Sequence, residues 1–298
     1  MKIVVAGASG LLGRALIDSL PGHDVIALVR HGEPIKGAKP VVWNGLRMDR
    51  WADEIDGADV VVNYCGSPVI AKWTDENKSL MKETRVQPTY LMGQAIEGAE
   101  RPPKVWINAS AVGYYGSRGA EMLDETSAQG SDFLAQLCGT WEQTLMQETL
   151  PNTRRVALRT GIVLAKRGGA LKPLLKLTKL FLGGAQGDGH QWMPWIHLDD
   201  HTAMVRWLME CDLNGPVNAV GPAPCLNSTF METLRHVVVR PPAPPVPKGI
   251  LDLVGKIKGP SPEVVLASDR VIPKVAQEAG FKWKHPSLEE ALRNLVKD

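Results

Sequence analysis

Three glycines near the start of the chain are spaced in a way that suits binding of a pyrophosphate. Gly7, Gly10 and Gly13 lie in GASGLLG, which follows the apolar run KIVVA and precedes a segment with helical spacing. The first glycine permits a tight turn, the second lets backbone approach a phosphate, and the third lets the helix pack closely on the strand. The helix N-terminus adds free N–H groups and the positive end of a dipole. The pattern favours dinucleotide binding over a simple turn. Further contacts are expected from the intervening residues Ser9, Leu11 and Leu12.

The end of the second apolar run indicates which dinucleotide is bound. An acidic residue at this position, about 20 residues beyond the glycines, would bind the ribose 2′-hydroxyl of NAD. The run VIALVR instead ends at Arg30, and His31 follows it. An arginine can form charge-assisted hydrogen bonds with the 2′-phosphate of NADP. A solvated surface arginine is the alternative, but the position at the end of a strand favours NADP(H) as the cofactor.

The segment HQWMPWIHLDDH contains residue types that could bind a metal ion. Its candidate ligands are His190, His197, Asp199, Asp200 and His201. Their spacing matches neither HxH nor HExxH. An aspartate at a strand–helix junction more often caps the helix that follows and holds a neighbouring loop. We therefore expect an aspartate cap and no metal site.

The tryptophans and the glutamine of the same segment have another expected role. Gln191, Trp192 and Trp195 are expected to border a substrate cleft. With nine tryptophans in the chain, some of them are expected to be core residues instead.

These residues require a fold that gathers the ends of several strands along one edge. Apolar segments that read as strands alternate with segments of helical spacing, which predicts an α/β fold with a doubly wound parallel sheet of the Rossmann type. In such a sheet, ligands bind outside the carboxyl ends of the strands. The predicted strands are KIVVAG, DVIALVR, GADVVVNYCG, KVWINASA and RRVALRTGIVLA.

The alternation changes after about residue 165, which predicts a second, smaller unit. We assign residues 1–165 and the returning segment 195–222 to the NADP-binding Rossmann domain. Residues 166–194 and 223–298 are assigned to a C-terminal substrate domain. There, the basic, leucine-rich LKPLLKLTKLFL predicts a lid helix rather than a membrane-surface helix, and RPPAPPVP predicts an extended connector rather than a ligand for an SH3-like domain.

The order of several motifs resembles that of one protein group. GASGLLG, VVNYCGSPVIAKWT, ASAVGYYG, WIHLDD and RVIPKVAQEAGFKWKHPSLEEAL occur in the order seen in extended short-chain dehydrogenase/reductases. More narrowly, the chain resembles the atypical NAD(P)-binding "epimerase family" proteins that carry their own conserved C-terminal domain. The resemblance covers almost the whole chain. It implies a Rossmann fold and an NAD(P) cofactor, whereas the word epimerase there describes a fold and not an assigned reaction.

The resemblance also implies further cofactor contacts. Tyr64, Cys65 and Gly66 in NYCG would lie beneath the adenosine and ribose, with Cys65 standing where a small alanine is usual. Arg85, in the helical segment KSLMKETRV, would face the cofactor, although a proline three residues later leaves the local course of that helix open. Val163 in RTGIVLA would lie near the nicotinamide.

Candidates for proton transfer follow from the same resemblance. A serine or threonine at the position of Ser110 hydrogen-bonds the substrate in active relatives, and Ser110 is also expected to contact the cofactor. The usual Tyr-x-x-x-Lys pair places a lysine where it lowers the pKa of the tyrosine, but Phe133 and Leu137 stand at those positions here. Tyr114 and Tyr115 are the remaining candidates, and an aromatic pocket wall explains them equally well.

The composition of the chain argues against several classes of protein and of binding partner. The chain has 298 residues, 44% of them hydrophobic, with a net charge of +2, which gives no case for a nucleic-acid surface. Its four cysteines are scattered and predict neither a zinc site nor a disulfide framework. The N-terminus reads as a strand rather than a signal peptide, and no apolar run is long enough to span a membrane. We expect a cytoplasmic protein with a small-molecule substrate, and a homodimer is one option for its assembly.

Two functions are compatible with these features. The first is an NADP(H)-dependent oxidoreductase or epimerase-like enzyme acting on an unidentified small molecule, favoured by the glycine turn, Ser110 and the two tyrosines. The second is a non-catalytic protein that senses NADP(H) and signals its state to a partner, favoured by the missing Tyr–Lys pair. A tyrosine without a lysine stays protonated near neutral pH. It would donate a hydrogen bond to a carbonyl oxygen, which favours carbonyl reduction over hydroxyl oxidation.

Overall fold

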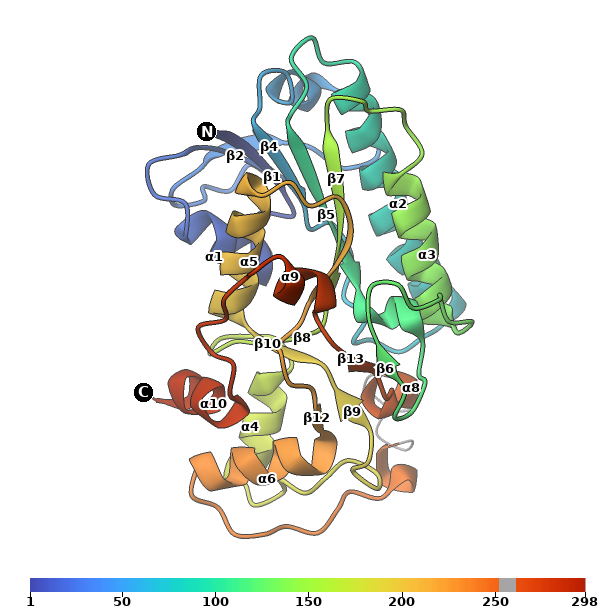
Figure 1. Ribbon diagram of the computed structural model, residues 1–298, viewed down its shortest axis with the longest axis vertical. Helices are drawn as coiled ribbons and strands as arrows, with labels where there is room; N and C mark the ends of the chain where they lie inside the picture. Colours follow the sequence, from blue (N-terminus) through green and yellow to red (C-terminus); the bar gives the residue numbers. More distant parts are fainter. Residues whose placement is uncertain (252–260, 298) are drawn as a thin grey trace.

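Apolar segments from distant parts of the chain form a single parallel sheet. The computed structural model describes residues 1–251 and 261–297, and in it seven strands lie in the order β11-β7-β5-β4-β1-β2-β3 (Figure 1). The order turns back between β1 and β4, as in the Rossmann fold, which confirms the predicted doubly wound α/β fold. The strands are β1 (Lys2–Ala6), β2 (Asp24–Val29), β3 (Lys39–Val42), β4 (Val60–Asn63), β5 (Val105–Ala111), β7 (Arg154–Thr160) and β11 (Gly215–Ala219).

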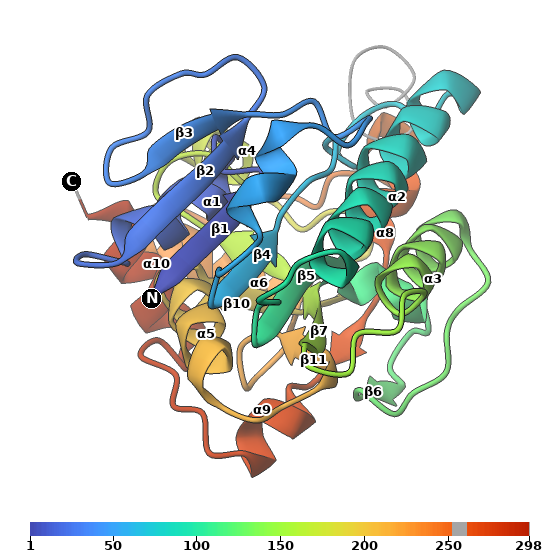
Figure 2. The ribbon, with the colours of Figure 1, turned by 90° about the horizontal axis from the view of Figure 1, so that it is seen from above.

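Helices cover both faces of this sheet because its central strands are apolar on both faces. Successive residues of a strand point to opposite faces, so that Ile3 belongs to one buried core and Val4 to the other. The two helix layers are separated by the sheet in Figure 2. They are α1 (Leu11–Asp18) and α5 (Leu198–Glu210) on the first face, and α2 (Asp75–Glu97) and α3 (Phe133–Leu145) on the second.

The pairing register brings the carboxyl ends of the strands to one edge of the sheet. Ala6 at the end of β1 pairs with Leu28 of β2 and with Asn63 at the end of β4. Asn63 in turn pairs with Asn108 of β5. The glycine turn after β1, Arg30 after β2 and the segment after β4 therefore leave the sheet side by side, facing the smaller lobe (Figure 1).

The predicted strand RRVALRTGIVLA is in fact two strands that belong to different sheets. β7 ends at Thr160, and β8 (Ile162–Leu164) pairs with β10 (Trp195–His197) between the two lobes. A Cβ on Gly161 would collide with the carbonyl oxygen of Pro194, which instead accepts a hydrogen bond from the Ile162 N–H at 2.7 Å. The close approach of Pro194 thus requires a glycine and separates the two strands.

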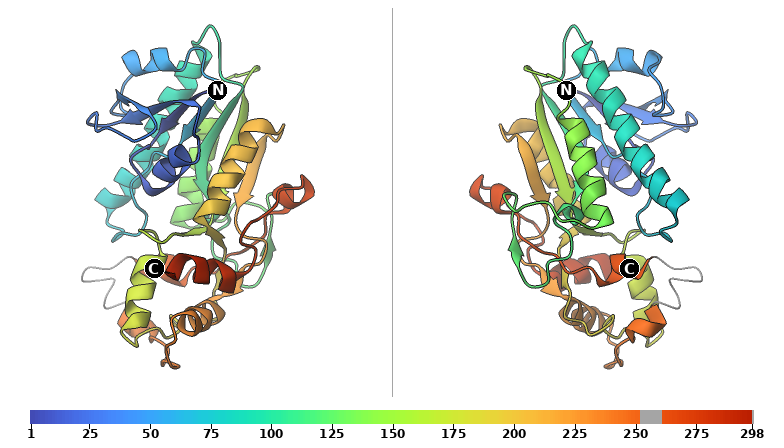
Figure 3. Two further views of the ribbon diagram at one scale, coloured as in Figure 1. Left: turned by 90° about the vertical axis from the view of Figure 1, so that its left-hand side faces the viewer. Right: turned by 90° about the vertical axis from the view of Figure 1, so that its right-hand side faces the viewer.

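The smaller lobe is built from short elements around its own apolar core. Leu171 of α4, Phe230 of α6 and Leu292 of α10 are buried in this core, which agrees with the predicted packing of the basic, leucine-rich helix. Figure 3 shows the lobe below the carboxyl edge of the sheet. Its elements are α4 (Leu171–Lys179), β9 (Trp192–Met193), β12 (Cys225–Leu226), α6 (Asn227–Val237), α8 (Pro262–Leu266) and α10 (Leu288–Val296).

The remaining short elements line the main sheet or connect the lobes. Strand β6 pairs in parallel with β13, which ties the segment after β5 to the C-terminal part of the chain. These elements are η1 (Arg50–Glu54), η2 (Val112–Tyr115), β6 (Met122–Leu123), β13 (Arg270–Val271) and α9 (Lys274–Glu278).

Two segments that contain proline keep an ordered course in the structure. Helix α2 continues from Asp75 to Glu97 with Pro88 inside it, which settles the course that the sequence left open. In the Pro-rich strip, the Val246 N–H donates to the carbonyl oxygen of Ala185 at 2.7 Å, and Val246 accepts from Gly187 at 2.9 Å. These bonds confirm that the strip is a connector packed within its domain.

A helix that crosses a membrane needs about 20 consecutive, mostly apolar residues. Within residues 1–251 and 261–297, no helix combines the length and the apolar character needed to cross a bilayer.

Candidate functional site

The glycine turn between β1 and α1 combines two glycines that the fold requires with one that it does not. Gly7 has a φ of +70°, and a Cβ there would lie 2.8 Å from the backbone of Tyr64. A Cβ on Gly13 would lie 2.5 Å from the carbonyl oxygen of Gly7. At Gly10 the only neighbour within 4 Å would be the Gly7 oxygen at 3.3 Å. Gly10 is therefore the least crowded of the three glycines, at the N-terminus of α1, where a phosphate can approach the backbone.

Arg30, the predicted contact for a 2′-phosphate, lies at the carboxyl end of β2. It is exposed and directly follows the buried end of β2. Burial raises the pKa of the neighbouring Cys65 thiol to about 12, against an opposing effect of the positive charge of Arg30. The guanidinium therefore lies within electrostatic range of the segment after β4, and Cys65 is an uncharged thiol at neutral pH.

Arg85 supports the segment after β4 from below. Its guanidinium donates hydrogen bonds to the carbonyl oxygens of Met81 and Ser67, both at 2.9 Å, and lies 5.1 Å from the ring of Trp141. A Cβ on Gly66 would lie 2.9 Å from the guanidinium carbon. Arg85, predicted to face the cofactor, is buried here and fixes the path of the backbone at Gly66.

Tyr64 directs its side chain into the core rather than toward the edge. Its ring centroid lies 6.0 Å from that of His201 in α5, and its hydroxyl is buried without a hydrogen-bond partner among the described residues. Burial raises the pKa of Tyr64 and lowers the pKa of His201 to about 4, so that both are neutral at pH 7. The Tyr64 ring, predicted to lie beneath the adenosine and ribose, therefore packs toward α5.

Two other predicted contact residues meet at the far side of the turn. The half-buried Leu11 begins α1, and Val163 lies in the middle of β8. A Cβ on Gly169 would lie 3.1 Å from the carbonyl oxygen of Val163 and 3.6 Å from a methyl carbon of Leu11. The structure thus brings the helix of the glycine turn next to the strand predicted to approach the nicotinamide.

Ser110 is bound to a buried ion pair. Its hydroxyl donates to Glu142 Oε1 at 2.6 Å, and Glu142 forms two hydrogen bonds with Arg159, at 2.9 and 2.8 Å. The side chain of Arg159 is 4% exposed. Arg159 follows the apolar residues Val156 to Leu158, and its place in a buried network was not recognised from the sequence.

Tyr115 belongs to the same network. Its ring is fully buried, and its hydroxyl donates to Asn218 Oδ1 at 2.7 Å and accepts from Arg159 Nη1 at 3.0 Å. Burial raises the pKa of Tyr115 to about 12, although Arg159 opposes this shift. The Arg159 guanidinium carbon also lies 3.5 Å from the ring centroid of the half-buried Tyr114. Tyr115 thus has structural partners on both sides of its hydroxyl, and no cleft-facing surface.

The N-terminus of α3 supplies packing. Phe133 is half-buried, its ring centroid lies 5.1 Å from that of Trp73, and Lys78 Nζ lies 5.2 Å from the same ring. Leu137, one turn later, is buried. The two side chains therefore pack on neighbouring elements.

A buried carboxyl group near this helix end was not found from the sequence. Asp269 is 9% exposed, and its Oδ1 has no hydrogen-bond partner within the described chain. Burial, with a smaller contribution from the charge of Asp132, raises its pKa to about 7. Asp132 is the N-cap of α3, so Asp269 places a protonatable group within electrostatic range of the start of this helix. Nothing in the sequence around Asp269 marks it as buried.

A cavity of about 350 Å³ lies in the smaller lobe, with Gly187, Asp188, Gln191, Lys248 and Leu266 in its wall. Cavities that bind small molecules are typically of this size. Gln191, which was predicted to border a substrate cleft, lines this cavity.

Trp195 differs from the prediction made for it. It is 1% exposed, and its indole N–H donates to the carbonyl oxygen of Ala223 at 3.0 Å. Trp195 is therefore a core residue.

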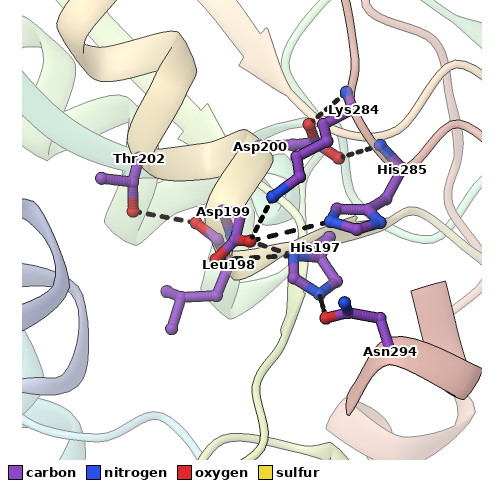
Figure 4. Close-up of polar contacts among 8 residues, drawn as sticks. All are labelled: His197, Leu198, Asp199, Asp200, Thr202, Lys284, His285 and Asn294. Atoms are coloured by element: carbon purple, nitrogen blue, oxygen red, sulfur yellow. Dashed lines mark hydrogen bonds and ion pairs between the residues drawn. The ribbon is translucent and has the colours of Figure 1, made fainter. Parts of the chain in front are cut away.

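The strand–helix junction at the start of α5 differs in part from the prediction (Figure 4). The cap is His197, whose Nδ1 accepts from the Asp199 N–H at 3.0 Å, and not an aspartate. An imidazole nitrogen can take this role when the other ring nitrogen carries the proton. Asp200 holds a neighbouring loop as predicted, because its carboxylate accepts from the N–H groups of Lys284 and His285 at 2.6 and 3.0 Å.

The strand order, the glycine turn and the added lobe define a Rossmann-type nucleotide-binding protein of the extended kind. Residues 3–220 match the NAD dependent epimerase/dehydratase family, and residues 246–295 match a domain of unknown function. The chain therefore belongs to the NAD dependent epimerase/dehydratase family. An epimerase family protein of Mycobacterium leprae is 34% identical over 293 residues, which cover 97% of this chain and 94% of that protein.

Two solved structures extend the similarity to the whole fold. The human epimerase family protein SDR39U1, crystallised with NADPH, superposes with a TM-score of 0.89 at 29% identity and covers 99% of both chains. A nucleoside-diphosphate sugar epimerase from Corynebacterium glutamicum has a TM-score of 0.80 at 33% identity, covering 99% of this chain and 58% of the other. Both confirm the fold and the resemblance drawn from the sequence motifs.

Proposed function

We propose that this protein binds NADP(H) along the carboxyl edge of its sheet and acts on a small molecule as an oxidoreductase or epimerase-like enzyme. The observation that carries the proposal is the glycine turn at the carboxyl end of β1, together with the exposed Arg30 at the end of the neighbouring strand β2. The similar human protein was crystallised with NADPH, which supports this choice of cofactor. Space for the substrate is proposed between the carboxyl edge of the sheet and the smaller lobe, in which Gln191 lines a cavity.

The preference for NADP(H) rests on Arg30 and can be measured directly. Each charge-assisted hydrogen bond to a 2′-phosphate contributes about 1.5–3 kcal/mol, which corresponds to roughly tenfold or more in affinity. Arg30→Ala is expected to weaken NADPH binding by at least that factor and to leave NADH binding nearly unchanged in a fluorescence titration. Arg47→Ala, at another exposed arginine, is the control and should bind as the natural protein does.

A second substitution separates loss of the phosphate contact from loss of the whole site. A Cβ at Gly10 would meet one backbone atom of the protein itself, the Gly7 carbonyl oxygen at 3.3 Å. Gly10→Val therefore needs only a small adjustment of the turn, and it should fold and yet bind neither NADPH nor NADH. If Arg30→Ala weakened both nucleotides equally, Arg30 would not recognise the phosphate. Should the natural protein and Gly10→Val bind NADPH alike, the glycine turn would not be the site.

A specific observation favours a second function, the sensing of NADP(H) without catalysis. The hydroxyls of Ser110 and Tyr115 are both engaged in the buried network around Arg159. The half-buried Tyr114 is then the accessible member of the predicted proton-transfer set. A sensor would need the cofactor site but none of these groups, and a substrate screen distinguishes the two functions.

The binding partners, the assembly and the location of the protein are matters for proposal. We infer that the physiological ligand besides NADP(H) is a small molecule, and that neither nucleic acid nor a membrane is a partner. A homodimer and a cytoplasmic location stay predictions. Light scattering of the purified protein measures the first, and fractionation of cells that produce it measures the second.

A further inference from the structure

Three potential metal ligands from two distant segments meet at the N-terminus of α5. His197 ends β10, Asp199 lies in the first turn of α5, and His285 comes from the loop before α10 (Figure 4). One nitrogen or oxygen from each side chain lies within 4.8 Å of the others. Asp199 Oδ2 is 3.7 Å from His285 Nε2, and Asp199 Oδ1 is 4.0 Å from His197 Nδ1. His197 and Asp199 are two positions apart in the sequence, but His285 is too far along the chain to be connected with them by spacing.

We propose that His197, Asp199 and His285 bind one divalent transition-metal ion, with Zn²⁺ as the expected ion, and that the ion links α5 to the C-terminal segment. Two imidazoles and a carboxylate form a donor set that suits zinc and does not suit magnesium or calcium. With three protein ligands, a four-coordinate ion would keep one position for water. This site is independent of the cofactor edge and of the function proposed above.

The observed separations are close to those that a zinc ion requires. Bonds of about 2.0–2.2 Å to nitrogen and oxygen place tetrahedral ligands about 3.3–3.5 Å apart. The carboxylate-to-imidazole distances, 3.7 and 4.0 Å, exceed this range by only a few tenths of an ångström. The two imidazole rings lie 3.9 Å apart at an angle of 31°. The third separation, between the ligand nitrogens of the two histidines, is no more than 4.8 Å, and movement of the side chains toward Asp199 is needed to close the site.

An unpartnered nitrogen at the site points to a missing ligand. His285 is 8% exposed, and its Nε2 is buried without a hydrogen-bond partner within the described residues. A buried polar atom without a partner lowers stability, and such atoms are rare in native proteins. The backbone N–H of the same residue is held by Asp200, which fixes the position of the ring. A bound ion would give Nε2 the partner that the protein does not provide.

His197 has the outer contact expected of a metal-binding histidine. Its Nε2 lies 3.1 Å from Asn294 Oδ1 of α10, and the acceptor there assigns the ring proton to Nε2. Nδ1 is then unprotonated and directed at Asp199, where it now accepts the N–H that caps α5. Metal-binding histidines commonly donate their second N–H to an oxygen in this way. Binding of the ion replaces the capping hydrogen bond, which is the cost of using this residue.

The ammonium group of a lysine forms an ion pair with the carboxylate of the proposed site. Lys284 Nζ lies 3.4 Å from Asp199 Oδ2, and the Lys284 side chain is 70% exposed. An exposed ion pair of this kind contributes little to stability, so that a divalent ion can displace the ammonium into solvent. The lysine is therefore a competitor for the site, and its removal should strengthen metal binding. A purely structural ion pair would not behave in this way.

The test uses the untagged full chain after treatment with a chelator. Isothermal titration with Zn²⁺ is expected to give one equivalent per chain, and Co²⁺ should give the visible absorption of a four-coordinate ion. His285→Ala and Asp199→Asn should each weaken binding at least about tenfold, whereas Lys284→Gln should strengthen it. His190→Ala is the matched control, because His190 also lies 3.6 Å from an aspartate but is 79% exposed. It should bind zinc as the natural chain does.

Several results would overturn the proposal. Equal zinc affinity of the natural chain and both ligand variants would place any binding elsewhere, and loss of binding in His190→Ala would point to the surface pair. The natural chain could also take up neither ion, and the cluster would then be a histidine–aspartate contact only. If His285→Ala failed to fold, two other variants would still test the proposal. Asp199→Asn, at a half-exposed side chain, should weaken zinc binding, and Lys284→Gln should strengthen it. Weaker binding in Lys284→Gln contradicts the competition on which the site depends.

Discussion

One buried carboxyl group is expected to make the stability of this protein depend on pH. Burial raises the pKa of Asp269 to about 7 in the folded chain, whereas an unfolded chain titrates the same group near its ordinary value of 3.8. Between these values the folded state keeps a proton that the unfolded state has lost. The free energy of unfolding therefore falls as the pH rises from about 4 to about 7 and is level above that range, with a total loss of up to about 4 kcal/mol.

Replacing the carboxyl by an amide tests this expectation. Asp269→Asn cannot ionise, so it should remove the fall in stability and be more stable than the natural protein at pH 8. Urea unfolding at a series of pH values measures both quantities. Asp188→Asn, at a side chain that is 75% exposed, is the control and should keep the pH dependence. An unchanged dependence in Asp269→Asn would show that another group titrates.

The contact between α3 and β7 depends on a buried ion pair. The side chains of Glu142 and Arg159 are 14% and 4% exposed and share two hydrogen bonds. Glu142→Gln keeps the shape of the side chain but leaves the Arg159 charge without compensation. Removal of one partner from a buried pair typically costs about 3–5 kcal/mol. We expect a loss of this size in the free energy of unfolding, measured in urea at pH 7.

An exposed ion pair in the same chain provides the comparison. Glu121 pairs with Arg118 at 2.6 Å, but the side chain of Glu121 is 50% exposed. Glu121→Gln should therefore change stability by no more than about 1 kcal/mol. Equal effects of the two substitutions would show that burial of the Glu142 pair has no energetic consequence. The comparison also measures how firmly Ser110, a hydrogen-bond partner of Glu142, is held.

Whether the protein catalyses a reaction or only senses NADP(H) depends on both lobes, because the proposed substrate space lies between them. We expect a screen of carbonyl compounds with NADPH to reveal slow oxidation of the cofactor near pH 7, since a protonated tyrosine favours reduction. Ser110→Ala, Tyr114→Phe and Tyr115→Phe would then be assayed with the compound found. Turnover that survives all three changes would exclude these residues as proton donors. Tight NADPH binding without turnover across the screen would favour the sensor.

Much of the fold could be predicted because its signals are local. Apolar runs, helical periodicity and the glycine turn are properties of neighbouring residues, and they predicted the central strands and the layers of helices. The exposed strand Lys39–Val42 was missed because it lacks an apolar run. The conformation of Gly7 and the close packing at Gly13 follow from the position of the turn between a strand and a helix. The same local reasoning predicted that Arg30 lies at the end of the second strand.

The tertiary structure alone decided which polar groups meet. Ser110 was recognised as a candidate, but its engagement with Glu142 depends on how α3 packs beside β5. Gly161 separates two strands only because Pro194 approaches it closely. His285 lies next to His197 because Asp200 holds the C-terminal loop against α5. The chemistry available at each site depends on contacts between residues far apart in sequence, and local spacing carries no information about which distant partner the folded chain brings into contact.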